Sequence, residues 1–176
     1  MIFGRTPLEG AVTVDAELVT DERGWFARLF AVEEFERRGL DPAVAHVNAS
    51  FNERAGTLRG MHYQAAPEAE AKLVRCVRGA LFDVIVDLRP DSATYCQWHA
   101  EELTAGNRRC LYVPEGMAHG FQTLEAATEV LYLMSRPYAP SHAAGVRWND
   151  PAFHIEWPDA ERTISERDMA YPDFRP

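Results

Sequence analysis

Short runs of β-forming residues follow one another at regular spacing through most of this chain, and turn residues separate them. Such runs occupy residues 11–19, 24–30, 57–64, 97–105, 109–116, 119–125 and 128–138. The longer stretch 72–90 (KLVRCVRGALFDVIVDLRP) indicates two strands that meet at Arg78 and Gly79. Many short strands with glycine and proline turns are typical of a β-sandwich or a barrel. The pattern therefore predicts an all-β fold.

Two segments depart from this strand pattern. Residues 32–40 (VEEFERRGL) carry apolar side chains between charges and end near Gly39, which predicts one short amphipathic helix with a glycine C-cap. Residues 148–174 are rich in aromatics, prolines and acids and show little periodicity. We expect this tail to run as extended chain over the barrel. No repeat or change of composition marks a second domain, so we expect a single domain over 1–176.

The charge and the cysteines limit the possible functions and compartments. A net charge of -9 and a pI near 5.1 argue against nucleic-acid binding through a basic surface. No apolar run approaches a membrane span, and the N-terminus lacks a secretory signal pattern. The cysteines Cys76, Cys96 and Cys110 form no Cys-x-x-Cys pair, and any disulfide scheme leaves one unpaired. We therefore expect a cytoplasmic protein with reduced thiols.

His62, in the middle of the strand-like run 57–64, is the first candidate for chemistry. Together with His119, which follows a Pro-x-Gly turn, it resembles the two motifs of metal-binding cupins. Gln64 stands where a second histidine would be expected, and an amide is a poor ligand for a transition metal. A histidine also titrates near neutral pH, which suits removal of a proton beside a carbonyl group. An ordinary polar residue on a sheet face is the third possibility.

A histidine base needs an orienting acceptor, a proton donor on the opposite face of the substrate and a group that stabilises an enolate. The chain offers three kinds of side chain for these tasks: carboxylates at Asp83, Asp87 and Asp168, tyrosines at Tyr132 and Tyr138, and cations at Arg59 and Lys72.

Two of these candidates have structural alternatives. Residues 165–168 (SERD) also fit a helix N-cap, and Tyr132 also fits a core position. Strict alternation places Arg59 and His62 on opposite faces of a strand, unless Gly60 forms a bulge.

Seven motifs occur in an order that resembles one enzyme family. They are DERGWFARLF, GTLRGMHYQ, AKLVRC, FDVIVDLR, LYVPEGMAHGFQTL, WNDPAFHIEWP and SERD, and they extend from about Pro7 to Pro172. The ordered set resembles the dTDP-4-dehydrorhamnose 3,5-epimerase family. The resemblance implies a cupin-type antiparallel jelly roll with a few short helices and without a catalytic metal or cofactor. It also implies a homodimer with exchanged N-terminal segments and a substrate that is a nucleotide-linked 4-keto-6-deoxyhexose.

The same resemblance implies roles for individual residues. It makes His62 the base, Asp168 its orienting carboxylate, Tyr132 the proton donor to the other face, and Lys72 the cation beside the C4 oxygen. It also implies that a further set lines the sugar or nucleotide pocket: Arg23, Phe26, Asn48, Arg59, Gln64, His119, Tyr138, Trp148 and Arg167. Arg23 and Phe26 are expected to come from the partner chain.

Three positions differ from the pattern of this family. Arg28 and Ala143 stand where glutamates are common, and His46 stands in place of a glutamine. These departures leave three alternatives open: an epimerase that inverts one carbon, an enzyme for a CDP-linked or otherwise modified sugar, and a cupin-type protein that binds a nucleotide sugar without catalysis.

Overall fold

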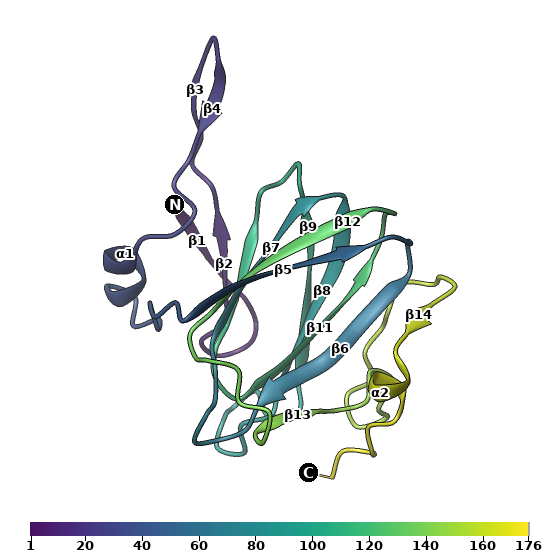
Figure 1. Cartoon of the computed structure of the whole chain (residues 1–176). Helices are drawn as coiled ribbons and strands as arrows, with labels where there is room; N and C mark the ends of the chain where they lie inside the picture. Colours follow the sequence, from purple (N-terminus) through teal and green to yellow (C-terminus); the bar gives the residue numbers. More distant parts are fainter. Residues whose placement is uncertain (176) are drawn as a thin grey trace.

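The computed structural model describes residues 1–175, which form two sheets of antiparallel strands (Figure 1). The first sheet has the order β1 (Ile2–Arg5), β2 (Val12–Asp15), β10 (Cys110–Val113), β7 (Lys72–Arg78), β12 (Thr128–Met134) and β5 (His46–Asn52). The second has the order β13 (Ala143–Gly145), β6 (Thr57–Gln64), β11 (Met117–Thr123), β8 (Ala80–Asp87) and β9 (Trp98–Thr104). The short β14 (Thr163–Ile164) pairs in parallel with β6. The predicted all-β jelly roll is confirmed.

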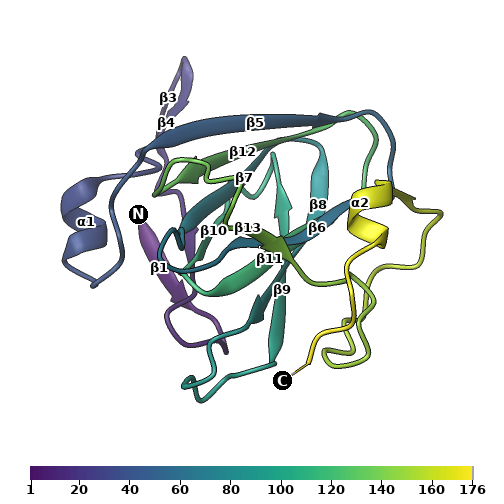
Figure 2. The same ribbon diagram turned by 60° about the horizontal axis from the view of Figure 1, so that its bottom comes forward.

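The remaining elements lie around these sheets. Strands β3 (Val19–Asp21) and β4 (Gly24–Phe26) form a hairpin that projects away from the barrel (Figure 1). Helices α1 (Val32–Glu36) and α2 (Glu166–Met169) lie on opposite sides of the molecule (Figure 2). No helix within residues 1–175 is both long and apolar enough to cross a membrane.

The main hydrophobic core lies between the two sheets. It includes Val74 and Val130 from the first sheet and Leu81, Ile85 and Phe121 from the second, each at most 2% exposed. Leu81 and Ile85 are four residues apart on β8 and therefore point to the same face of a strand. Full burial of each such side chain stabilises the fold by about 1.5–3 kcal/mol.

The boundaries of several elements differ from those predicted. The predicted strand 11–19 is split into β2 and β3, and only Gly24–Phe26 of the run 24–30 is strand. The predicted helix 32–40 ends at Glu36. Gly39 nevertheless terminates it as expected, because its φ of 70° lets the Leu40 N–H reach the carbonyl of Phe35 at 3.1 Å.

Four strands lack a clear sequence signal. Strands β1, β13 and β14 have two to four residues each, and β5 carries the exposed apolar side chains Val47 and Phe51. The C-terminal tail packs over the barrel as predicted: Phe153 is buried, and Trp157 lies beside it in the same cluster.

Candidate active site

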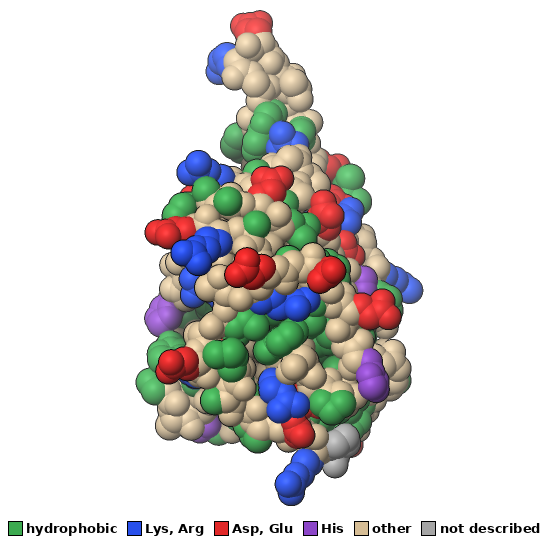
Figure 3. Space-filling model, turned by 90° about the vertical axis from the view of Figure 1, so that its right-hand side faces the viewer, with side chains coloured by type: hydrophobic (Ala, Val, Ile, Leu, Met, Phe, Trp, Pro, Cys, Tyr) green, Lys and Arg blue, Asp and Glu red, His purple; other side chains and the backbone are tan. Residues whose placement is uncertain are grey.

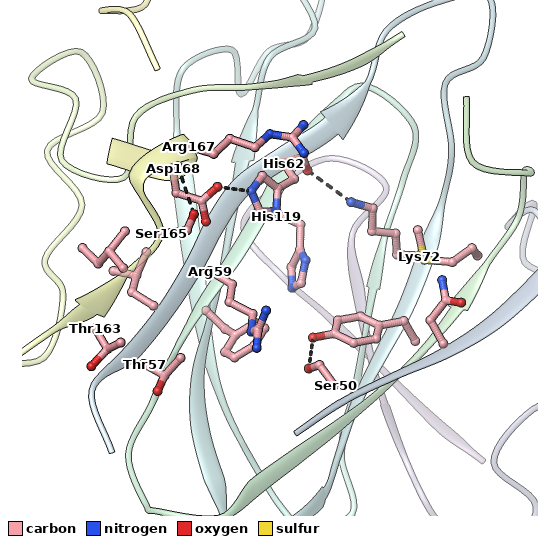
Figure 4. A pocket seen from close by; sticks show the side chains of 16 residues that line it. Ser50, Thr57, Arg59, His62, Lys72, His119, Thr163, Ser165, Arg167 and Asp168 are labelled. Carbon is pink, nitrogen blue, oxygen red and sulfur yellow. Dashed lines mark hydrogen bonds and ion pairs between the residues drawn. The ribbon is translucent and has the colours of Figure 1, made fainter. Parts of the chain in front are cut away.

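A cavity of about 650 Å³ opens between the two sheets, on the face that carries β6, β14 and α2 (Figures 3 and 4). Strands β5, β7, β11 and β12 contribute the rest of its lining. Three cations, Arg59, Lys72 and Arg167, line it together with a single carboxylate, Asp168. The cavity is therefore basic although the chain carries a net charge of -9, and it suits an anionic ligand.

A bulge in β6 turns Arg59 and His62 into the same cavity. His119 of β11 pairs with His62 and Phe121 pairs with Arg59, so one residue between them on β11 opposes two on β6. Gly60 has a φ of 144°, and a Cβ there would lie 2.6 Å from the Cα of Gly120. The bulge thus needs glycine at both positions, because other side chains favour neither this backbone conformation nor this close approach.

His62 is held by a carboxylate from the far end of the chain. Its Nε2 lies 2.7 Å from Oδ1 of Asp168, while Oδ2 accepts the Gly60 N–H at 3.1 Å. Burial acts to raise the pKa of Asp168, but the hydrogen bonds from His62 and Gly60 outweigh it and hold this pKa below its ordinary value. Asp168 is therefore ionised at neutral pH. It fixes the imidazole so that Nδ1 is free to accept a proton.

The two alternatives for residues 165–168 both apply. Ser165 is the N-cap of α2, and its Oγ accepts the backbone N–H of Asp168 at 3.1 Å. The Asp168 side chain is free to accept from His62 because the serine, and not the aspartate, caps the helix.

Lys72 is the only lysine in the sequence, and it lines this cavity. Its side chain is 7% exposed, and its Nζ donates to the backbone carbonyl of His62 at 3.1 Å. Burial lowers the pKa of Lys72 below that of an ordinary lysine, and the neighbouring carboxylate of Glu70 opposes this shift.

Tyr132, on β12 of the other sheet, lines the same cavity, and its ring lies 6.3 Å from the ring of His119. Its ring packs against the main core, and its hydroxyl lies 2.9 Å from Oγ of Ser50. Burial raises the pKa of Tyr132 well above its ordinary value, so the phenol is protonated throughout the neutral range. A protonated hydroxyl at this position can donate a proton to a ligand on the side away from His62.

A second histidine and carboxylate pair lies beside the first. Nε2 of His119 is 2.7 Å from Oδ1 of Asp83, and both side chains are nearly fully buried. Burial raises the pKa of Asp83, although His119 and Lys72 oppose the shift. Asp83 is therefore the partner of His119 and not of His62.

Asp87 does not reach the cavity either. Its carboxylate accepts hydrogen bonds from Arg89, Ser92 and Thr94, and this network lowers its pKa, against the effect of burial, to about 2.

Five of the nine residues that the sequence assigned to the substrate do not line the cavity of this chain, and three of them belong to the barrel and its tail. Gln64 is buried: its amide nitrogen donates to the carbonyls of Glu68 and Pro137, and its oxygen accepts the Ala139 N–H at 2.7 Å. These bonds tie together two loops, a task that explains an amide at this position. Tyr138 is exposed. The ring of Trp148 stacks on the guanidinium of Arg162, whose Cζ lies 5.0 Å from the ring centroid.

Asn48, Arg59, His119 and Arg167 do line the cavity. Arg23 and Phe26 lie instead on the projecting hairpin, far from the cavity of their own chain (Figure 1). The three departures from the family pattern, Arg28, His46 and Ala143, also lie outside the cavity lining.

Sequence reasoning missed several residues that hold the site in place. Ser50 contacts Tyr132, and Asn52 accepts a 2.8 Å hydrogen bond from Nε of Arg59. Alternation from Asn48 would have found both, because residues 48, 50 and 52 share a face once β5 is recognised as a strand. Thr163 has no such signal, because β14 is too short to show a period.

No three His, Cys, Asp or Glu side chains gather in residues 1–175 in a way that could hold a metal ion. His62 and His119 each pair with a single carboxylate, and Gln64 points elsewhere. The absence of a catalytic metal stays a prediction.

Comparisons with known proteins agree with this geometry. The family model described as dTDP-4-dehydrorhamnose 3,5-epimerase matches residues 5–176. A relative of that name from Sinorhizobium fredii is 44% identical over 155 residues, which is 88% of this chain and 80% of the relative. The crystal structure of dTDP-4-dehydrorhamnose 3,5-epimerase from Elizabethkingia anophelis superposes with a TM-score of 0.96 at 35% identity, covering 99% of this chain and 96% of that one.

A second solved structure extends the comparison. The enzyme of the same name from Bacillus anthracis, with TDP and PPi bound, superposes with a TM-score of 0.92 at 39% identity and covers 97% of both chains. The family predicted from the ordered motifs is thus confirmed. Because the family model spans nearly the whole sequence and the relatives share both the fold and more than a third of the residues, this chain belongs to the dTDP-4-dehydrorhamnose 3,5-epimerase family and is an isomerase of the sugar epimerase type.

Proposed function

We propose that this chain inverts C3, C5 or both of a dTDP-linked 4-keto-6-deoxyhexose by proton transfer through an enolate. The observation that carries the proposal is the arrangement of three groups at one cavity. His62 with Asp168 lies on one sheet, Tyr132 lies on the opposing sheet, and Lys72 lies at the cavity beside them. Inversion at carbon needs a base on one face and an acid on the other, and this arrangement supplies both.

The first step is removal of a proton from a carbon next to the C4 ketone. Nδ1 of His62 takes the proton, and the Asp168 carboxylate stabilises the imidazolium that forms. The electron pair of the broken C–H bond moves toward the C4 oxygen and gives an enolate. The ammonium of Lys72 stabilises the negative charge on that oxygen, an effect worth about a hundredfold or more in rate.

The second step returns a proton to the opposite face. The phenol of Tyr132 donates its proton to the enolate carbon, and the carbon is left with inverted configuration. Both C3 and C5 are neighbours of C4. The same cation therefore serves either carbon. Once the imidazolium has released its proton to water and the phenolate has taken one up, the same pair of proton-transfer groups can act again.

The basic lining supports a nucleotide diphosphate as the carrier. Arg59 and Arg167 offer guanidinium groups, which bind phosphate oxygens in a bidentate manner. The enzyme from Bacillus anthracis contains TDP in its crystal structure, which supports dTDP as the nucleotide here. The free cysteines Cys76 and Cys110, both buried, suit a reducing compartment, and we place the reaction in the cytoplasm.

Incubation with a dTDP-linked 4-keto-6-deoxyhexose in D2O tests this function. We expect deuterium from solvent to appear at C3, at C5 or at both, as followed by NMR of the sugar. The pattern of labelling identifies which carbons are inverted. Binding of the nucleotide sugar without any exchange would contradict catalysis and favour the nucleotide-sugar-binding alternative.

We also infer a homodimer in which the β3–β4 hairpin of each chain reaches the partner. The hairpin exposes Val19, Trp25 and Phe26, and Phe26 is 70% exposed. Strand β5 is an open edge of the first sheet with further apolar side chains on its surface. Exposed apolar side chains and open sheet edges are commonly buried when two protein chains associate. Arg23, at the tip of this hairpin, would then act at the partner's cavity.

Light scattering at micromolar concentration should give the mass of a dimer. Phe26→Asp should shift the protein toward the monomer, because it places a charge in the covered surface. Val32→Asp, which changes an exposed apolar residue on α1, should leave the dimer intact. A wild-type monomer at these concentrations would count against the exchanged segment.

A further inference from the structure

Glu70 forms a buried ion pair with Lys72. Oε1 of Glu70 lies 3.3 Å from Nζ of Lys72, and both side chains are only 7% exposed. Glu70 lies in the loop that leads into β7, and a hydrogen bond from Gln64 to the carbonyl of Glu68 anchors that loop. A buried carboxylate beside a buried ammonium is costly to desolvate unless the two charges meet in good geometry. The pair therefore needs a reason beyond stability.

The hydrogen-bonding capacity of the ammonium supplies that reason. A lysine side chain has three N–H donors and no acceptor. One of them points to the carbonyl oxygen of His62 at 3.1 Å, and the ammonium forms its ion pair with Glu70 in a second direction. Lys72 lines the cavity (Figure 4). Because the three donors are arranged tetrahedrally and two directions are taken, the third is left for the cavity.

We propose that Glu70 is a positioning residue for catalysis: its carboxylate holds the Lys72 ammonium charged and turned so that its third N–H meets the developing enolate oxygen. This inference rests on the proposed function of Lys72. Without Glu70, a flexible four-carbon side chain would have one anchor, the His62 carbonyl, and its charge would have no direct partner.

The surrounding electrostatics make the role of Glu70 measurable. Burial lowers the pKa of Lys72. The carboxylate of Glu70 opposes this shift, and the carboxylate of Asp83 on β8 opposes it to a smaller extent. The other titratable or charged side chains that line the cavity are His62 and Arg59 on β6, His119 on β11, Tyr132 on β12, and Arg167 and Asp168 on α2. Burial raises the pKa of Tyr132. As the pH rises, Lys72 is therefore expected to lose its proton before Tyr132 does, and the activity should fall with it.

Glu70→Gln tests the inference, because it removes the charge and keeps the shape. The basic limb of the pH profile of kcat/KM should move to lower pH by roughly one unit or more, the usual effect of losing an opposite charge at this distance. Below that limb the variant should keep most of its activity. Glu68→Gln removes the same charge from a half-buried position in the same loop and should leave the profile unchanged.

A second measurement does not depend on activity. Lys72 is the single lysine of the chain, so protein labelled with ¹³C-lysine gives one side-chain resonance to titrate. We expect Glu70→Gln to lower the pKa read from that resonance and Glu68→Gln to leave it in place. An unchanged resonance and an unchanged basic limb in Glu70→Gln would overturn the inference. If the wild-type protein exchanges no deuterium, the proposed function fails, and the titration still decides whether Glu70 holds the charge of Lys72.

Discussion

Replacing His62 by alanine is expected to abolish deuterium exchange at every carbon that the wild-type protein exchanges. The imidazole is the group that the Asp168 carboxylate orients toward the cavity, and loss of a general base costs about 10²–10⁴-fold in rate. Binding of the nucleotide should survive, because Arg59 and Arg167 are untouched. Mass spectrometry of the sugar measures the exchange, and calorimetry with dTDP measures the binding.

Asp168→Asn should reproduce part of this loss. The amide cannot stabilise an imidazolium by charge, and it no longer selects the tautomer that leaves Nδ1 as the acceptor. Exchange should slow by about 10–100-fold, the usual cost of removing an orienting partner.

The chain also offers a matched control for His62→Ala. His99 pairs with Glu101 at 2.9 Å on β9, outside the cavity, so His99→Ala removes a comparable pair and should leave exchange at the wild-type rate. Exchange that persists in His62→Ala would assign the base to another residue.

The sequence predicts much of the fold because each buried strand carries its own signal. In β8, apolar side chains fill both faces: Leu81 and Ile85 belong to the core between the sheets, and Val84 and Val86 belong to the cluster that includes the C-terminal tail. Such a nearly continuous apolar run can be recognised without the structure. Strand β5 is different, because it is an edge strand with Val47 and Phe51 exposed. Because most of β5 is exposed, its residues show no apolar pattern, and neither the strand nor Ser50 is predicted from the sequence.

The site depends on contacts that alternation does not encode. Arg59 and His62 share a cavity because Gly60 makes a bulge, and the bulge depends on Gly120 of the neighbouring strand. The sequence indicates the bulge only as a possibility, because it depends on the close approach of Gly60 and Gly120, which are sixty residues apart in the chain. The pairing of His62 with Asp168, from the far end of the chain, was available only from the family resemblance. The local pattern of residues along the chain cannot predict a contact between positions as far apart as 62 and 168.

Tyr132→Phe is expected to separate exchange from inversion. In this variant His62 and Lys72 are intact, so the proton should still leave the carbon and the enolate should still form. The opposite face, however, has lost its donor. Protons or deuterons should therefore return from the side of His62, and the sugar should gain deuterium while keeping its configuration. We expect net inversion to fall by about 10²–10⁴-fold, the range for loss of a general acid, with exchange at the carbon largely retained.

NMR of the recovered sugar measures both quantities in one sample, since deuterium content reports exchange and coupling constants report configuration. Tyr112→Phe is a matched control on β10: it also removes a hydroxyl with a 2.9 Å hydrogen bond, here from the backbone N–H of Asp41, but it lies outside the cavity lining. This control should keep both exchange and inversion. If Tyr132→Phe instead loses exchange as completely as His62→Ala, enolate formation itself requires the phenol. Tyr132 would then act on the same step as the base, and a donor on the opposite face would have to be sought among the other groups at the cavity.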